Sequence, residues 1–464
     1  MRRYHARWVV PVSTPPMAHG VVIERAGRIE WVGASVDAPP RHADEDIVDL
    51  GDAVLLPGLV NAHCHLELTA MRGFLDGLGF REWILRLTSA RRAVLDEPAL
   101  LDAARLGVEE GIRAGITTFA DTSASGAGFD AMLERGVRGV CYREVFGPDA
   151  GQCDRAIAEL RARFVAMRAR ETGLVRAGLS PHAPYTVSDP LYRATANLAR
   201  ELDAPVAVHI AESALETALV TEGAGAFADG LRERGIGVGP RARSPIALLD
   251  TLGVLDVDPL LIHCVRVDDV DVRTIAERRC AVAHCPASNA RLAHGVAPLT
   301  ELLAAGIDVG LGSDSVASND RMDLLDEARQ ALLFATASTR DVGALSSAKA
   351  LELATLGGAR ALRLDREIGS LEPGKAADLA AFPLGACARL PTHDPVVAAV
   401  LALAGTQASY VTVAGRPLVR DGVACDADSS LARRVQESAD RLQAWLASPE
   451  GSRAVTHPTP TSGR

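Results

Sequence analysis

Between about residue 55 and residue 315, eight short apolar runs recur, and Ala-, Leu- and Arg-rich stretches of helical composition lie between them. The runs are LLPGLVNAH, AGITTFAD, VRGVCYREV, VRAGLSPHA, PVAVHIAE, PLLIHCV, CAVAHCPAS and DVGLGSDS. This alternation is typical of βα units, and eight of them over roughly 300 residues predict a TIM-type (β/α)8 barrel. A doubly wound sheet is the alternative, but no G-x-G-x-x-G follows the first run.

Short strands separated by turns flank the barrel region on both sides. VVIERAGRIEWVG has the pattern of strand, Ala-Gly turn and strand, and IGSLEPGKAADLAAF and YVTVAGRPLVRDG repeat this texture later. We therefore expect one small β-sandwich domain, discontinuous in sequence. The predicted segments are 1–56 and 366–425 for this domain, 57–365 for the barrel, 426–447 for a helix and 448–464 for a disordered tail rich in Pro, Ser and Thr.

Composition excludes several classes of protein. A chain of 464 residues with 48% hydrophobic residues can bury a large core. A net charge of −10 argues against nucleic-acid binding, and no apolar segment suits a membrane span or a signal peptide. The eight cysteines form no C-x-x-C pair, which is typical of reduced thiols. We expect a cytoplasmic protein that binds a small molecule and neither nucleic acid nor membrane; assembly into a homo-oligomer stays open.

Ionisable side chains end most of the predicted barrel strands. In such a barrel the carboxyl ends of the strands form the active-site face. The residues there are His63 and His65 on the first strand, His182 on the fourth, His209 and Glu212 on the fifth, His263 on the sixth, His284 on the seventh and Asp314 on the eighth. The histidines outside this pattern are His5, His19, His42, His294, His393 and His457. Each residue alone has an ordinary structural explanation, and the joint pattern favours a site.

The residue types predict a site for one metal ion. Neutral imidazoles and one carboxylate suit Zn²⁺, with Fe²⁺ as the alternative, and His63, His65, His209 and Asp314 make such a set. His63 and His65 alternate with Cys64, so both point to one side of the strand. The fourth strand has no lysine to bridge a second metal, and the P-C-x-x-C motif of the cytidine-deaminase zinc site is absent.

The remaining strand-end residues predict hydrolytic chemistry. A metal of this kind lowers the pKa of its bound water towards neutrality. Glu212 follows the ligand of the fifth strand by three residues, so we expect it to act as general base and then to return the proton. His263 is expected to hold the attacking oxygen, and Asp314 to take part in catalysis as well as in metal binding. His182 and His284 are expected to contact the substrate.

Several segments resemble the amidohydrolase superfamily, in particular its cytosine-deaminase-like branch, over nearly the whole chain. They are PGLVNAHCH, GITTFAD, SPHAPY, HIAES, HCPASNARLAHGVAP, LGSDSVASND and GSLEPGKAADL. The resemblance implies a barrel with a small flanking β domain, metal ligands at the four residues named above, a proton shuttle at Glu212 and a hydroxide-positioning histidine at His263. It also implies an enzyme, a hydrolase acting on C–N bonds in cyclic amidines.

Other segments are most similar to aminodeoxyfutalosine deaminases and to S-adenosylhomocysteine/methylthioadenosine deaminases: HCHLELTAMRG, FREWILRL, SPHAPYTVS, HIAESALETALVTEGAGAF and SDSVASNDRMDLLDE. This implies deamination of an adenine-type nucleoside, foremost of aminodeoxyfutalosine to futalosine plus ammonia on a route to menaquinone. The alternatives are an S-adenosylhomocysteine/methylthioadenosine or guanine-type deaminase, a heteroaromatic chlorohydrolase and, more remotely, a non-catalytic barrel scaffold. Retention of every proposed ligand argues against the last.

Three further residues are candidates for the substrate pocket. Glu67 and Arg143 suit a contact with a ribose or with a distal carboxylate, although an ordinary surface or helix-facing charge fits them equally well. Trp83 either lines the pocket mouth or packs a helix, and helix packing is the role that we expect.

Overall fold

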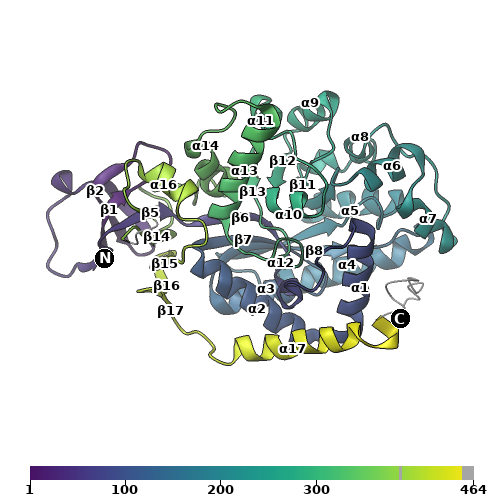
Figure 1. The fold of residues 1–464 in the computed structure, drawn as a ribbon, viewed down its shortest axis with the longest axis horizontal. Coiled ribbons are helices and arrows are strands. Elements are labelled where there is room, and N and C mark those ends of the chain that lie inside the picture. Colours follow the sequence, from purple (N-terminus) through teal and green to yellow (C-terminus); the bar gives the residue numbers. More distant parts are fainter. Residues whose placement is uncertain (386–388, 452–464) are drawn as a thin grey trace.

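The computed structural model describes residues 1–385 and 389–451 of the chain. It confirms the predicted fold class, with a barrel of eight parallel strands and a smaller sheet at one end of the molecule (Figure 1). The barrel strands are β6 (Leu59–Cys64), β7 (Ile116–Ser123), β8 (Arg138–Val145), β9 (Val175–Pro181), β10 (Ala207–Ile210), β11 (Leu260–His263), β12 (Ala281–His284) and β13 (Val309–Leu311). The predicted disordered tail lies largely outside the described residues.

Two short pairings close the barrel. Strands β6 to β9 form one four-stranded parallel sheet, and β10 to β13 form a second. Leu179 of β9 pairs with Val206 just before β10, and Cys64 of β6 pairs with Asp314 just after β13. The second junction joins the first and last strands at their carboxyl ends, so closing the barrel brings two sets of predicted ligands together.

Helices cover the outside of the barrel. At the start of α2, the side chain of Asp96 accepts a hydrogen bond from Ala99 N at 3.0 Å, and Pro98 occupies the first turn. The outer helices are α2 (Glu97–Arg113), α3 (Ala127–Arg135), α4 (Cys153–Arg168), α5 (Asp189–Leu202), α8 (Pro245–Thr251), α9 (Asp269–Glu277), α11 (Leu299–Ala304), α13 (Leu324–Thr339), α14 (Ser347–Glu352) and α15 (Gly358–Ala361). The other helices of this region are α1 (Phe80–Val94), α6 (Ala214–Glu222), α7 (Ala226–Glu233), α10 (Pro286–Arg291) and α12 (Val316–Asn319).

Alternate residues of β8 face opposite sides of the barrel wall. Tyr142 belongs to a buried cluster with Ala62 of β6 and Ile262 of β11, which fills the barrel interior. Cys141 belongs to the cluster that packs the strands against the outer helices. Even-numbered residues of β8 therefore face the interior, and odd-numbered residues face the helices.

The smaller sheet has nine strands, which come from both ends of the chain. Their order is β17-β16-β15-β14-β5-β1-β2-β3, with β4 beside β1. The strands are β1 (Arg2–Val9), β2 (Met17–Arg25), β3 (Arg28–Ala34), β4 (Asp46–Asp49), β5 (Ala53–Pro57), β14 (Leu379–Pro383), β15 (Tyr410–Val413), β16 (Arg416–Arg420) and β17 (Val423–Ala424). Helix α16 (Pro395–Leu401) lies between β14 and β15 in the sequence. The domain limits given above remain a prediction.

The run LLPGLVNAH, expected as one barrel strand, belongs to two sheets. Strand β5 pairs with β1 and β14 in the smaller sheet, whereas β6 begins the barrel at Leu59. Gly58 joins them, and a Cβ atom there would lie 2.2 Å from Oγ1 of Thr117 on β7. Only glycine fits so close a crossing. The strand prediction is therefore right at its end and wrong at its start.

A buried ion pair fixes the smaller sheet to the barrel. Arg138, at the start of β8, donates from Nε to Oδ2 of Asp378 at 2.9 Å, and both side chains are almost fully buried. Asp378 also accepts from Ala414 N at 2.7 Å, and its carbonyl accepts from Gly58 N at 2.8 Å. Losing one partner of such a pair leaves an uncompensated charge, so the pair resists separation of the two parts.

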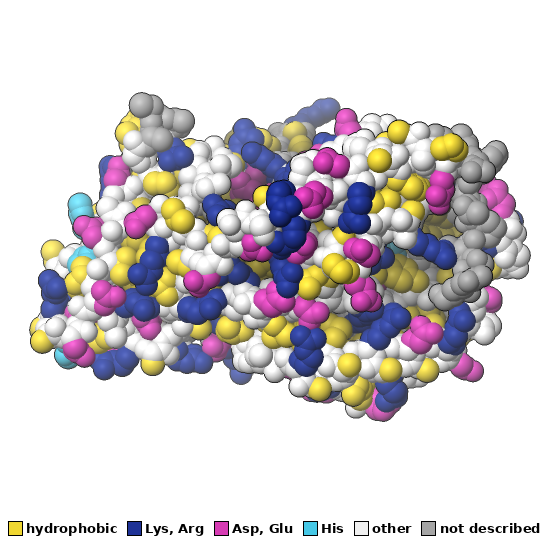
Figure 2. All heavy atoms as spheres, turned by 90° about the horizontal axis from the view of Figure 1, so that it is seen from below, with side chains coloured by type: hydrophobic (Ala, Val, Ile, Leu, Met, Phe, Trp, Pro, Cys, Tyr) yellow, Lys and Arg dark blue, Asp and Glu magenta, His cyan; other side chains and the backbone are white. Residues whose placement is uncertain are grey.

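The last helix, α17 (Leu431–Leu446), packs against α2 along one side of the barrel (Figure 1). Its Arg434 donates to both carboxylate oxygens of Asp102, at 2.7 and 2.9 Å. On the face shown in Figure 2, basic and acidic side chains are interspersed, unlike the basic face of a nucleic-acid-binding protein. Within the described part of the chain, no helix combines the length and the apolar character that a membrane span needs.

Candidate active site

Three imidazoles and one carboxylate meet at the carboxyl ends of the barrel strands. Nε2 of His65 lies 3.2 Å from Nε2 of His209, and Nε2 of His63 lies 3.3 Å from Oδ1 of Asp314. The same oxygen of Asp314 is 3.7 Å from Nε2 of His65. The structure thus brings together all four residues predicted as metal ligands.

The end of β6 departs from regular strand alternation. Ala62 faces the barrel interior, so a regular strand would turn the next side chain outwards. The pairing of β6 with β7 shifts register between Asn61 and Cys64. After this irregularity His63 and His65 both face His209 and the site.

Strand β13 approaches β6 closely at the same place. Asp314 N donates to the carbonyl of His63 at 2.9 Å, and Asp314 has a left-handed φ of 56°. A Cβ atom at Gly312 would lie 2.8 Å from Cβ of His63, so glycine is required there. The segment LGSD, residues 311–314, therefore positions the Asp314 carboxylate directly beside the His63 imidazole.

Hydrogen bonds orient the carboxylate and a fourth imidazole. Oδ1 of Asp314 accepts from Ser315 N at 2.6 Å, and Oδ2 accepts from the hydroxyl of Ser288. Nδ1 of His263 lies 3.0 Å from Oδ1 of Asn289. Because that oxygen accepts, Nδ1 carries the proton and Nε2 presents its lone pair to the site.

The donor set fits a divalent cation. Burial lowers the pKa of His63, His65, His209 and His263, so these imidazoles are neutral near pH 7. Burial opposes ionisation of Asp314, but the close approach of His63 holds the pKa of the carboxyl well below its usual range. Neutral imidazole and ionised carboxylate are the forms that bind metals. Nε2 of His63 is buried without a well-formed hydrogen bond to any described residue, which a bound cation would explain.

Glu212 lies between two imidazoles beside this donor set. Its Oε1 is 3.6 Å from Nε2 of His263 and 3.2 Å from Nε2 of His294. Glu212 N donates to Oε2 of Glu216 at 2.9 Å, and Ala211 N donates to Oε1 of Glu216 at 2.8 Å. The buried carboxyl of Glu216 therefore fixes the turn that carries Glu212.

His294 is a site residue that the strand-end pattern missed. It follows α10, where Ala293 adopts a left-handed φ of 57° and His294 N donates to the carbonyl of Asn289 at 2.8 Å. Its ring packs edge-on against Phe80, with centroids 4.4 Å apart. The available signal was its place in the loop after the seventh strand, because such loops build the active-site face.

A cavity opens in front of Glu212, and α1 supplies much of its wall. The contributing side chains of this helix include Phe80, Trp83, Ile84, Leu87, Thr88 and Arg91. Trp83 was expected to pack a helix, but it lines the cavity, and its Nε1 donates to the carbonyl of Ala317 at 3.3 Å. The wall is thus apolar and aromatic over most of α1 and cationic at Arg91.

Of the four predicted substrate contacts, His182 and Glu67 line the cavity. Arg143 is an odd-numbered residue of β8, so its side chain faces the outer helices, beside Gly126 at the start of α3. His284 is buried at the end of β12 and also lies outside the cavity lining. Neither side chain lines this cavity, and a substrate contact of Arg143 or His284 stays a prediction.

Glu67 lines the cavity with its acceptor atoms already engaged. Oε1 accepts from Nη2 of Arg91 at 2.7 Å. Oε2 accepts from the Ser123 hydroxyl at 2.7 Å and from Ser125 N at 3.0 Å. Glu67 therefore holds Arg91 at the cavity wall.

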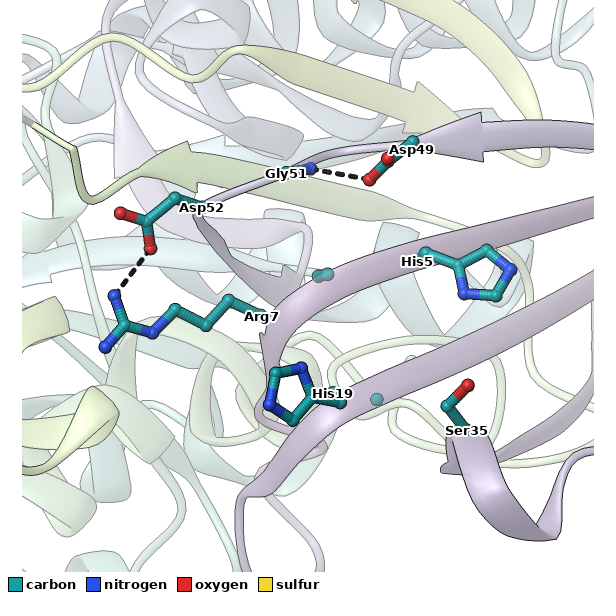
Figure 3. A pocket seen from close by; sticks show the side chains of 9 residues that line it. His5, Arg7, His19, Ser35, Asp49, Gly51 and Asp52 are labelled. Carbon is teal, nitrogen blue, oxygen red and sulfur yellow. Dashed lines mark hydrogen bonds and ion pairs between the residues drawn. The ribbon is translucent and has the colours of Figure 1, made fainter.

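A second hollow lies on the smaller sheet (Figure 3). Its lining includes His5, Arg7, His19, Ser35, Asp49, Gly51 and Asp52. Arg7 donates to Asp52 at 2.9 Å, and Asp49 accepts from Gly51 N at 2.9 Å. His5 and His19 come from the neighbouring strands β1 and β2, and the described residues around them provide no converging set of metal donors.

Comparison with known proteins places these features in context. A sequence profile of the amidohydrolase family matches residues 54–417. The 5-methylthioadenosine/S-adenosylhomocysteine deaminase of Moorella thermoacetica is 34% identical over 415 residues, covering 89% of this chain and 93% of that protein. The 5′-deoxyadenosine deaminase of Methanopyrus kandleri is 31% identical over 414 residues, covering 88% and 91%. A crystal structure of an adenosine deaminase from Xanthomonas campestris with bound zinc has a TM-score of 0.85 and 30% identity, covering 96% of this chain and 98% of that one.

Proposed function

The chain belongs to the amidohydrolase family, and on this premise we propose that it is a metal-dependent hydrolytic deaminase of an adenine nucleoside. The observation that carries the proposal is the position of Glu212 beside a convergent set of three imidazoles and one carboxylate. The relatives named for methylthioadenosine, S-adenosylhomocysteine and 5′-deoxyadenosine support the nucleoside class.

Four side chains would hold the metal: His63, His65, His209 and Asp314. The zinc in the similar Xanthomonas campestris structure supports Zn²⁺, and Fe²⁺ is the alternative. When bound, the cation supplies Lewis acidity that makes a water molecule easier to deprotonate.

The chain's own groups then move the protons. Glu212 takes a proton from the attacking water and gives it to the ring nitrogen next to the carbon that bears the amine. Nε2 of His263 accepts a hydrogen bond from the attacking water, and Asp314 then takes the one proton that remains on the oxygen. The new C–O bond forms as the ring C=N bond becomes single. Asp314 passes this last proton to the amine. The C–N bond to the amine then breaks as the C=O bond forms, and ammonia leaves.

The cavity favours a nucleoside with a large substituent beyond its ribose. Phe80, Trp83 and Leu87 form an apolar stripe along α1, and Arg91 follows one turn after Leu87. Aminodeoxyfutalosine carries an aromatic carboxylate beyond its ribose, so its ring suits the stripe and its charge suits Arg91. We therefore propose aminodeoxyfutalosine as the substrate and, with it, a role in menaquinone synthesis.

Ammonia release tests this proposal directly. Metal-replete protein is assayed side by side with aminodeoxyfutalosine, S-adenosylhomocysteine, methylthioadenosine, 5′-deoxyadenosine, adenosine and guanine. The highest kcat/KM is expected for aminodeoxyfutalosine. A higher kcat/KM for methylthioadenosine or 5′-deoxyadenosine would support a nucleoside deaminase but contradict aminodeoxyfutalosine as its substrate. If no adenine nucleoside released ammonia, the proposed function would be overturned.

Replacing Arg91 with Met should lower kcat/KM for aminodeoxyfutalosine by about 10- to 100-fold, because a hydrogen bond to a charged group is lost. The value for methylthioadenosine, which has no carboxylate, should change far less. Arg91→Lys should restore part of the loss. The matched control is Arg92→Met, which removes an exposed arginine from the same helix. Equal losses on both substrates would show that Arg91 acts on the fold and not on the carboxylate.

A further inference from the structure

Glu144 is a buried carboxyl in the cavity that the proposed reaction does not use. It lies near the end of β8, its side chain is 6% exposed, and it lines the same cavity as Glu212. Its Oε1 makes no hydrogen bond to any described residue. Buried polar atoms are almost always paired, so an unpaired one in a ligand cavity points to a ligand.

Strand alternation sends Glu144 into the cavity. As an even-numbered residue of β8 it faces the barrel interior, like Tyr142, whereas its neighbour Arg143 faces outwards. Of these two neighbours, Glu144 is the one that lines the cavity.

His182 stands opposite Glu144 with a second free polar atom. Nδ1 of His182 lies 2.8 Å from Oγ1 of Thr186, whose own proton goes to the carbonyl of Ala183 at 3.1 Å. Nδ1 of His182 therefore donates to Thr186, which leaves Nε2 as an acceptor. That nitrogen is 3.9 Å from Oε1 of Glu144, too far for a direct hydrogen bond.

Two neighbouring hydroxyl groups fit this pair of atoms. One hydroxyl can pair with Glu144 while the adjacent one donates to Nε2 of His182. Burial raises the pKa of Glu144 to about 8, and a hydroxyl, which both donates and accepts, satisfies the carboxyl in either protonation state. Glu67 is less suited to bind these hydroxyl groups, because its oxygens already accept hydrogen bonds from Arg91, Ser123 and Ser125.

We propose that Glu144 and His182 together bind the 2′,3′-diol of the sugar and select ribonucleosides over deoxyribonucleosides. The inference rests on the proposed nucleoside deaminase function and names a specificity determinant for it. Glu144 is not needed for proton transfer, because Glu212 has that role.

The test compares substrates that differ by one hydroxyl. kcat/KM is measured for 5′-deoxyadenosine and for its 2′- and 3′-deoxy derivatives, with wild type, Glu144→Ala, Glu144→Gln and Arg143→Gln. Wild type should favour the diol by up to about 100-fold, because a buried polar atom left without its hydroxyl partner costs about 1–3 kcal/mol. In Glu144→Ala the preference should shrink to about 3-fold or less, and Glu144→Gln should keep part of it. Arg143→Gln, on the opposite face of β8, should keep it fully.

The ratio of kcat/KM for the diol substrate to kcat/KM for the deoxy substrate distinguishes a change of specificity from damage to the fold. A structural effect lowers kcat/KM for the diol and deoxy substrates alike and leaves their ratio unchanged. An unchanged ratio in Glu144→Ala would therefore overturn the inference while the deaminase stands. Failure of wild type to deaminate any nucleoside would instead overturn the proposed function, and the inference with it.

Discussion

Glu212→Gln is expected to lower kcat by about 10² to 10⁴-fold, the range that general acid–base catalysis contributes, and to leave the metal content unchanged. The amide has nearly the same shape and keeps the same surroundings between His263 and His294. It has no carboxylate to accept the proton of water and return it to the ring. Ammonia release and metal analysis on the same preparation measure both quantities.

The matched control for this variant is Glu222→Gln. Glu222 lies at the exposed end of α6, the helix that follows Glu212, so its amide should leave kcat within about twofold, as most surface substitutions are nearly neutral. If Glu212→Gln retains kcat, Glu212 is not the proton shuttle. If it loses the metal, the carboxylate belongs to the ligand set.

Asp314→Ala and His209→Ala are each expected to reduce the bound metal from about one ion per chain to a small fraction, and activity with it. Each change removes one of four donors from a buried site in which neighbouring donors lie 3.2 to 3.7 Å apart. Changes to outer hydrogen-bonding partners already weaken metal binding by about 10- to 100-fold, so loss of a donor should exceed that. Metal analysis after dialysis against a weak chelator gives the measurement.

His284→Ala is the control for this pair. His284 is a buried histidine at a strand end that lies outside the cavity lining, so its loss should leave the metal in place. Full metal occupancy in Asp314→Ala would show that the carboxylate is not a ligand. Equal metal loss in all three variants would indicate general damage to the barrel.

The barrel strands and their polar ends were predictable because each signal is local. An apolar run such as PLLIHCV predicts a buried strand, and the histidine at its end then falls on the active-site face. The local sequence does not determine which of two adjacent side chains enters the cavity. Arg143 and Glu144 differ by one position, and the choice between them depends on which face of β8 is inside.

The start of the first barrel strand and the role of His294 needed the tertiary structure. LLPGLVNAH is apolar throughout because both of its halves are buried, although in different sheets. Periodicity cannot reveal a change of sheet at Gly58. His294 reaches Glu212 only because the chain turns back after α10. The local sequence does not predict that the two side chains lie close together.

The crossing at Gly58 has a consequence for how the protein is made. All the proposed metal ligands have been synthesised once residue 314 is added, and the strand that carries two of them continues directly from β5. β5 pairs with β14, which spans Leu379–Pro383, through five consecutive residue pairs. The edge of β5 that later pairs with β14 therefore stays unpaired while about 300 further residues are translated. A message cut short before β14 would encode every proposed ligand and still leave β5, which leads directly into the strand of the first two ligands, without its β14 partner.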